Sequence, residues 1–144
     1  MKVVLQRVTR ASVTIENQVN ADIGLGLLLL VGVASDDTSE DIQWLCRKIV
    51  NMRIFNDQKG VMNNSLLDVD GDAIVVSQFT LHASTKKGNR PSYIHAAKPE
   101  IAIPIYKEFI ERFQEQLGKK VGTGKFGADM KVCLLYTSPS PRDS

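Results

Sequence analysis

The sequence predicts a single α+β domain, with a mostly antiparallel, barrel-like β-sheet and two main helices. The chain has 144 residues, of which 43% are hydrophobic and 24% are charged, and this balance is typical of one globular domain. β-type patterns dominate the first and last parts of the sequence, whereas helical periodicity occurs in two segments between them. About six or seven strands combined with two helices indicate the α+β class.

The first strands are predicted near the N-terminus. Residues 2–9 are rich in β-formers, and residues 11–15 alternate apolar and polar side chains, which predicts a strand with one buried face. Residues 16–20 are polar and typical of a turn. Residues 27–33 form a continuous apolar run, which indicates a central strand. We expect these segments to form a meander.

Two segments have the periodicity of amphipathic helices. Asp37, Thr38 and Ser39 are N-cap candidates for the first helix. The second helix can begin at Pro99, which tolerates the first helical position, and end before Gly118. Apolar residues follow at helical spacing in each segment: Ile42, Leu45, Cys46, Ile49 and Val50 in the first, and Ile105, Phe109, Phe113 and Leu117 in the second.

The remaining segments complete the predicted sheet. Residues 52–55 favour a short strand, and residues 73–81 favour a strand whose end turns polar. Residues 82–97 lack apolar periodicity and predict a long basic loop, a kind of segment that often carries function. Two final strands are expected within residues 121–126 and 129–135.

Composition and charge exclude several classes of protein. The net charge of +2 is too small to indicate a nucleic-acid or membrane partner by itself, and the apolar run over residues 24–33 is shorter than a membrane span. Arg7 and Arg10 stand where a signal peptide needs apolar residues, so we expect a cytoplasmic protein. Cys46 and Cys133 provide no disulfide framework, and Cys46 is interpreted as a reduced core thiol.

Chemistry-bearing residues are few. His82 and His95 are the only histidines, and no cysteine or carboxylate cluster stands at ligand spacing from them, so we expect no metal and no cofactor. Candidate nucleophiles are Ser77, Thr80 and Ser84. His82 follows Thr80 by two residues, which puts both on one face if the strand continues. These residues leave open a small-molecule esterase that uses Thr80 and His82.

The basic loop suggests a different partner. Lys86, Lys87 and Arg90 could bind phosphates, and Tyr93 and His95 could stack on a base. The alternative is a solvated surface loop. The residues alone do not decide between these two interpretations.

Several motifs occur together in one order along the chain: Gln6-Arg7-Val8, Ala11-Ser12-Val13, Arg53-Ile54-Phe55, Ser77-Gln78-Phe79-Thr80-Leu81, Gly88-Asn89-Arg90-Pro91-Ser92 and Phe126-Gly127-Ala128-Asp129-Met130. In this order and spacing they resemble the D-aminoacyl-tRNA deacylase family, over nearly all of residues 1–132. The resemblance implies a homodimer with active sites at the subunit interface. It also implies hydrolysis of the ester between a D-amino acid, or glycine, and the 3′ adenosine of tRNA, which is a proofreading step of translation.

The resemblance also implies roles for particular residues. Ser77, Gln78 and Phe79 are expected to line the substrate pocket, and Thr80 occupies the catalytic position. We favour a positioning role for Thr80, with water as the attacking group, because no convincing base accompanies it. Arg7 is expected to brace the loop of the partner subunit that reads chirality.

The C-terminal tail departs from the family pattern. The family has Asn-Asp-Gly-Pro-Val-Thr here, and its Gly-cisPro pair enters the facing subunit's pocket; Ser138 and Pro139 stand at that position. Residues 133–144 resemble a translated sequencing adapter, so we expect a deacylase domain over residues 1–132 followed by a non-native tail. A divergent natural tail is the alternative, since its Ser and Pro content is typical of disorder. Without the Gly-cisPro pair, a catalytically inactive tRNA-binding dimer also remains open.

Overall fold

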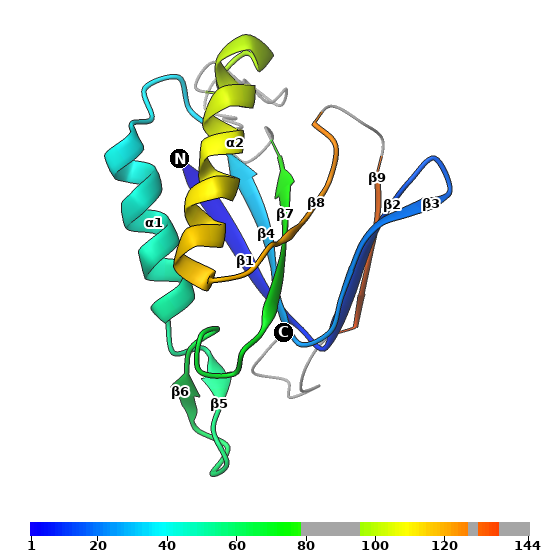
Figure 1. Ribbon diagram of the computed structural model, residues 1–144, viewed down its shortest axis with the longest axis vertical. Helices are drawn as coiled ribbons and strands as arrows, with labels where there is room; N and C mark the ends of the chain where they lie inside the picture. The colour runs from blue at the N-terminus through cyan, green and yellow to red at the C-terminus, as the bar shows by residue number, and fades with distance from the viewer. Residues whose placement is uncertain (79–95, 127–129, 136–144) are drawn as a thin grey trace, which may run out of the picture.

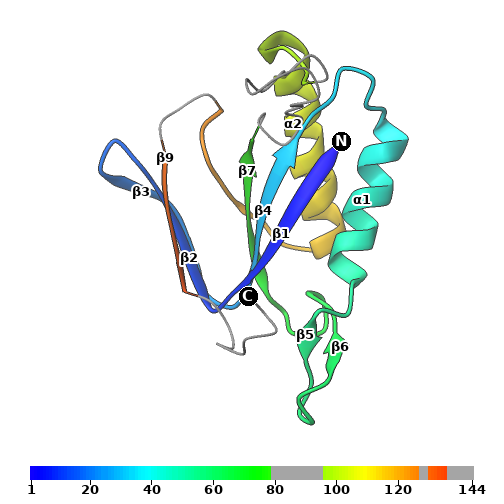
Figure 2. The same ribbon diagram turned by 180° about the vertical axis from the view of Figure 1, so that it is seen from behind.

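The computed structural model describes residues 1–78, 96–126 and 130–135, and these residues form three layers (Figure 1). Two helices cover one face of a four-stranded sheet, and a three-stranded sheet lies against the other face. A two-stranded hairpin extends from one end of the central layer. Figure 2 shows the same order of layers from behind.

The four-stranded sheet forms the middle layer. Its strand order is β1 (Lys2–Val8), β4 (Gly26–Gly32), β7 (Asp72–Ser77) and β8 (Gly122–Thr123). β1 runs antiparallel to β4, whereas β7 runs parallel to both β4 and β8. The apolar run therefore lies between two other strands, as its composition predicts.

The three-stranded sheet is entirely antiparallel. β2 (Arg10–Ile15) lies between β3 (Gln18–Ile23) and β9 (Met130–Leu135). The separate hairpin consists of β5 (Phe55–Asn56) and β6 (Met62–Asn64). The third layer thus joins an early segment of the chain to its last described strand.

β4 is apolar throughout because both of its faces are buried. Leu27, Leu29 and Val31 pack in the core against the helices, whereas Leu28 packs against the three-stranded sheet. A Cβ added at Gly26 would lie 1.8 Å from the carbonyl oxygen of Asp72. Glycine at this position is therefore required for the close approach of β4 and β7.

The first helix, α1 (Ser39–Asn51), begins as the sequence predicts. Thr38 is the N-cap, and its side chain and that of Asp41 form a capping box. The Cys46 thiol is free and fully buried, with its sulfur 3.6 Å from the carbonyl oxygen of Phe109, which confirms its interpretation as a core thiol. Burial raises its pKa to about 12, so the thiol stays protonated.

The second helix, α2 (Pro99–Leu117), also has the predicted bounds. It carries Pro99 in its first turn and ends at Gly118, whose φ of 82° is left-handed and suits a residue without a side chain. Its buried face packs against α1 and the four-stranded sheet. The residues of that face are Ala102, Tyr106, Phe109, Phe113 and Leu117.

The α+β class, the two helices and the predominance of antiparallel pairs are confirmed, but two details differ. The sheets are not closed into a barrel within the described ranges. The predicted meander is wrong, because β1 pairs with β4 while β2 pairs with β3. Glu16 and Asn17 have φ values of 50° and 64°, which make a tight hairpin turn, so residues 18–23 form a strand that the polar composition concealed.

In the described part of the chain, no helix is long and apolar enough to cross a membrane.

Candidate functional site

The first group of predicted site residues lies at the C-terminal end of β7. Ser77 is the last residue of this strand and pairs with Val31 of β4. The backbone N–H of Gln78 donates to the Val31 carbonyl oxygen at 2.8 Å. Both side chains are partly buried. The hydrogen bond extends the β4–β7 pairing one residue beyond the strand, so Gln78 is held at the edge of the sheet.

The chain returns to the same edge after residue 95. Ala96 forms a bridge with Ala34, and the N–H of Ala97 donates to the Val33 carbonyl oxygen at 2.9 Å. Gln78 and Ala96, the described residues on either side of segment 79–95, therefore both lie beside the end of β4 or the two residues that follow it. Phe79, Thr80, His82 and the predicted basic cluster fall within that segment, outside the described residues.

A tyrosine that the sequence analysis did not single out supports this end of β7. The hydroxyl of Tyr106 donates to the Val75 carbonyl oxygen at 2.9 Å. Its ring lies 6.1 Å from that of Phe126, at an interplanar angle of 53°. Burial raises its pKa to about 12, so the hydroxyl remains a hydrogen-bond donor at neutral pH. The signal that could have found it is a tyrosine on the buried stripe of α2, because a buried hydroxyl needs a partner.

The second group lies at the opposite end of the four-stranded sheet. Arg7 of β1 pairs with Leu27, and its guanidinium donates to the Ile54 carbonyl oxygen at 3.0 Å. The last residue of β9, Leu135, lies nearby. Its carbonyl oxygen accepts hydrogen bonds from the N–H of Thr9 at 2.8 Å and from the Thr9 hydroxyl at 3.0 Å. The last described residue, Leu135, thus lies at the Arg7 end of the sheet, and Ser138 and Pro139 fall outside the described residues.

The fold therefore separates the described residues of the predicted site. Arg7 is level with Leu27 and Ser77 is level with Val31, four residues apart on β4. At the usual rise of a strand, this offset is about 13 Å along the sheet. In Figure 1 these positions correspond to the lower end of β1 and the upper end of β7. Arg7 therefore does not reach Ser77 or Gln78 along the sheet.

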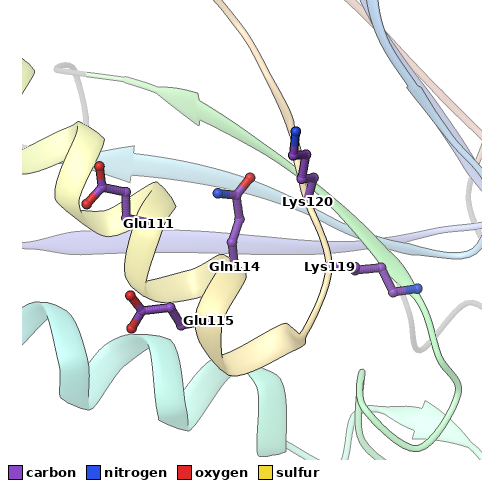
Figure 3. A pocket seen from close by; sticks show the side chains of 5 residues that line it. All are labelled: Glu111, Gln114, Glu115, Lys119 and Lys120. Atoms are coloured by element: carbon purple, nitrogen blue, oxygen red, sulfur yellow. The ribbon is translucent and has the colours of Figure 1, made fainter.

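The described surface also has a shallow depression beside the end of α2, shown in Figure 3. Lys119 points from it toward the start of β7, where its ammonium group binds the Asp70 carbonyl oxygen at 3.0 Å and the Asp72 carboxylate at 3.2 Å. The glutamates of α2 do not converge with it on one point. This depression contains none of the predicted site residues: its lining is Glu111, Gln114, Glu115, Lys119 and Lys120.

Metal ligation finds no support in the part of the chain that the structure describes. No group of three or more His, Cys, Asp or Glu side chains gathers there in a way that could hold an ion.

Comparison with known proteins identifies close relatives. The D-aminoacyl-tRNA deacylase of Christiangramia forsetii is 65% identical over 139 residues, which are 96% of this chain and 93% of the relative. The protein of the same name from Bacteroides thetaiotaomicron is 61% identical over the same share of each chain.

Solved structures agree with this fold. A structure described as a c-Myc DNA unwinding element binding protein matches with a TM-score of 0.86 and 38% identity, over 94% of this chain and 91% of that one. A probable eukaryotic D-amino acid tRNA deacylase matches with a TM-score of 0.80 at 16% identity, over 93% and 92% of the two chains, and this match concerns the fold alone. The family model for D-Tyr-tRNA(Tyr) deacylase matches residues 4–140, and the chain therefore belongs to that family.

Proposed function

We propose that this protein hydrolyses the ester bond of D-aminoacyl-tRNA, releasing the free D-amino acid and tRNA. The observation that carries the proposal is the family match over residues 4–140, together with relatives of that activity name at 65% and 61% identity over nearly their whole length. The activity acts in translation proofreading, which suits a cytoplasmic location, and glycine is a second acyl group of the class.

The hydrolysis of this ester requires only a modest rate enhancement from the protein. Water adds to the acyl carbon, the bond to the ribose 3′ oxygen breaks, and that oxygen takes a proton. An aminoacyl ester is already activated toward water, so positioning of the substrate and hydrogen bonds to the developing oxyanion provide enough acceleration. The mechanism therefore needs no metal and no cofactor, and the attacking water is assisted by the neighbouring ribose 2′ hydroxyl.

The end of β7 is the proposed substrate pocket. Ser77 and Gln78 are held there by pairing with β4, and the next two residues of the chain are Phe79 and Thr80. In the proposed pocket Phe79 provides a flat wall for the terminal adenosine, and Thr80 orients the ester rather than attacking it. A trapped acyl-enzyme on Thr80, lost together with nearly all activity in Thr80→Ala, would contradict this assignment.

The placement of Arg7 and Ser77 at opposite ends of the four-stranded sheet supports a site shared between the two subunits of a homodimer. Arg7 and the exit of β9 lie about 13 Å along the sheet from the proposed pocket. Leu135, the last described residue before the tail, thus lies at the end of the sheet opposite the proposed pocket of its own subunit, and this supports entry of the tail into a second subunit's pocket. We propose that Arg7 braces the partner's chirality-reading tail, and that Ser138 and Pro139 stand where this tail enters the facing pocket.

The decisive experiment compares D-tyrosyl-tRNA and L-tyrosyl-tRNA as substrates. Three proteins are assayed: the chain as it stands, a version in which residues 136–141 are replaced by Asn-Asp-Gly-Pro-Val-Thr, and the single variant Ser138→Gly. We expect the restored version to cleave the D-ester and spare the L-ester. Ser138→Gly is the matched control, because it removes only the Cβ at the close approach and leaves the other tail residues unchanged.

The other outcomes separate the alternatives. A restored version that binds tRNA but cleaves neither ester favours the inactive tRNA-binding dimer. Cleavage of simple esters without the tRNA body, abolished by His82→Ala, favours the small-molecule esterase. Equal cleavage of the D-ester by the chain as it stands and the restored version would contradict the expectation that residues 133–144 disable the site.

A further inference from the structure

The support of β7 differs between its two flanks. On the β4 side, pairing runs from Asp72 to Ser77 and is extended by the Gln78 N–H. On the β8 side, pairing ends with Val75 opposite Thr123. Among the described residues, the last two positions of β7 therefore have a strand neighbour on one flank only.

Pairing of β7 with β8 ends at Val75. The carbonyl oxygen of Val75 accepts hydrogen bonds from two donors. The Gly124 N–H reaches it at 3.3 Å, and the Tyr106 hydroxyl reaches it at 2.9 Å. The tyrosine bond is the shorter one, and it comes from a side chain that is only 4% exposed. The peptide group that it holds lies two residues before Ser77.

Tyr106 also contacts a second segment that carries a motif. Its ring packs against Phe126, the first residue of Phe126-Gly127-Ala128-Asp129-Met130, while its hydroxyl holds the strand that leads into Ser77-Gln78-Phe79-Thr80-Leu81. One buried side chain of α2 thus joins two motif-bearing segments that are far apart in the sequence. A structural tyrosine elsewhere in the core would not have this double contact.

We propose that Tyr106 is a positioning residue for ester hydrolysis, because its hydroxyl holds the Val75 peptide and through it the Ser77–Gln78 end of β7. The inference rests on the proposed function. The hydroxyl acts through the backbone and touches no substrate atom. Displacement of a reacting geometry by about 1 Å can lower a rate by roughly 100-fold, so loosening this peptide affects turnover more than binding.

The test compares Tyr106→Phe with Cys46→Ala in the version of the chain that cleaves D-tyrosyl-tRNA. Phenylalanine keeps the ring contact with Phe126 and removes only the hydroxyl. Cys46→Ala is the matched control, because the buried polar contact that it removes joins α1 to α2 and involves no group of β7. We expect Tyr106→Phe to lower kcat about tenfold with KM within about twofold of the parent, which indicates an interaction needed in the transition state. Cys46→Ala should change neither constant.

Amide hydrogen exchange provides a readout that does not depend on turnover. Exchange within residues 72–78 should rise at least about tenfold in Tyr106→Phe and stay unchanged in Cys46→Ala. An active parent with unchanged kcat in Tyr106→Phe overturns the inference and leaves the proposed function intact. An equal loss of kcat in Cys46→Ala also overturns it, because general loosening then explains the effect. A parent inactive with or without the restored tail overturns the proposed function, and the positioning role with it.

Discussion

The two ends of the four-stranded sheet differ in what they contribute. The Ser77 end presents the polar end of β7, and the chain leaves and rejoins it on both sides of segment 79–95. The Arg7 end collects a guanidinium bound to the Ile54 carbonyl and the exit of β9. Of the described residues that the family resemblance assigns to the active site, Ser77 and Gln78 lie at one end and Arg7 lies at the other. The difference teaches that the described site residues of one chain lie about 13 Å apart along the sheet.

The most direct test of this difference between the two ends of the sheet is to mix two inactive variants. In the version with the restored tail, Gln78→Ala and Pro139→Ala, each as a homodimer, should lose at least about 100-fold in activity toward D-tyrosyl-tRNA. After subunit exchange, half of the dimers are mixed and one of the two sites in each is intact, so activity should recover to about a quarter of the parent's. Deacylation assays before and after exchange measure this recovery. No recovery, with exchange verified by mass-labelled subunits, would mean that Gln78 and Pro139 act within one subunit.

Gly26 tests the packing of the Arg7 end. Its added Cβ would meet the Asp72 carbonyl oxygen at 1.8 Å, so Gly26→Ala must push β4 and β7 apart and should cost more than about 4 kcal/mol of the free energy of unfolding. Gly60→Ala is the control with the same chemical change: its φ is 78° but no atom lies within 4 Å of the new Cβ, so about 1 kcal/mol is expected. Urea denaturation measures both. Similar losses in the two variants would contradict the close approach of the strands.

Lys119 joins the end of α2 to the start of β7, at the same end of the sheet. Lys119→Met removes its bonds to the Asp70 carbonyl and the Asp72 carboxylate and should cost about 0.5 kcal/mol, because the groups are partly exposed. Lys120→Met is the matched control. Within the described residues, Lys119 forms ion pairs with Asp70 and Asp72, whereas Lys120 forms none. The shift in urea midpoint should shrink at high salt. A salt-independent loss would point to packing of the lysine stem instead.

Asp68 should make the smallest contribution, visible only in acid. The backbone N–H of Ser65 donates to its carboxylate at 2.9 Å, and this bond, with the Ser65 hydroxyl, lowers its pKa below the usual 3.8. A lowered folded-state pKa stabilises the fold above the unfolded-state value, and this stabilisation is lost as the pH falls through the folded-state value. Asp68→Asn should therefore reduce the drop in urea midpoint between pH 7 and pH 3. Between pH 7 and pH 6 the variant and parent should change equally, and a difference there would implicate another group.

Local patterns in the sequence were sufficient for the elements of the helical layer. Thr38 was one of three adjacent N-cap candidates, and the apolar ladder from Ile105 to Leu117 faces the core as its spacing predicts. Capping and periodicity are interactions within a few residues of the chain, so they can be read locally. The pairing of strands could not be read in this way, because Gln18–Ile23 has a weak alternation and its turn depends on two left-handed residues.

The same contrast between local patterns and strand pairing applies to the candidate site. Ser77, Gln78 and Arg7 could be named from motifs, whereas their separation across the sheet depends on which strands pair. Tyr106 could be predicted as buried from its place on the α2 stripe, but not as a partner of Val75, which lies 31 residues earlier in the chain.

By itself, the sequence determined the class of fold, the two helices, the buried central strand and the family, because each depends on short-range patterns or on the joint order of motifs. Only the tertiary structure decided that β1 and β2 enter different sheets, that Arg7 and Ser77 lie at opposite ends of β4, and that Tyr106 holds β7. The physical reason is that pairing between distant segments is selected by burial and hydrogen bonding summed over the whole chain, and no local window of sequence contains that sum.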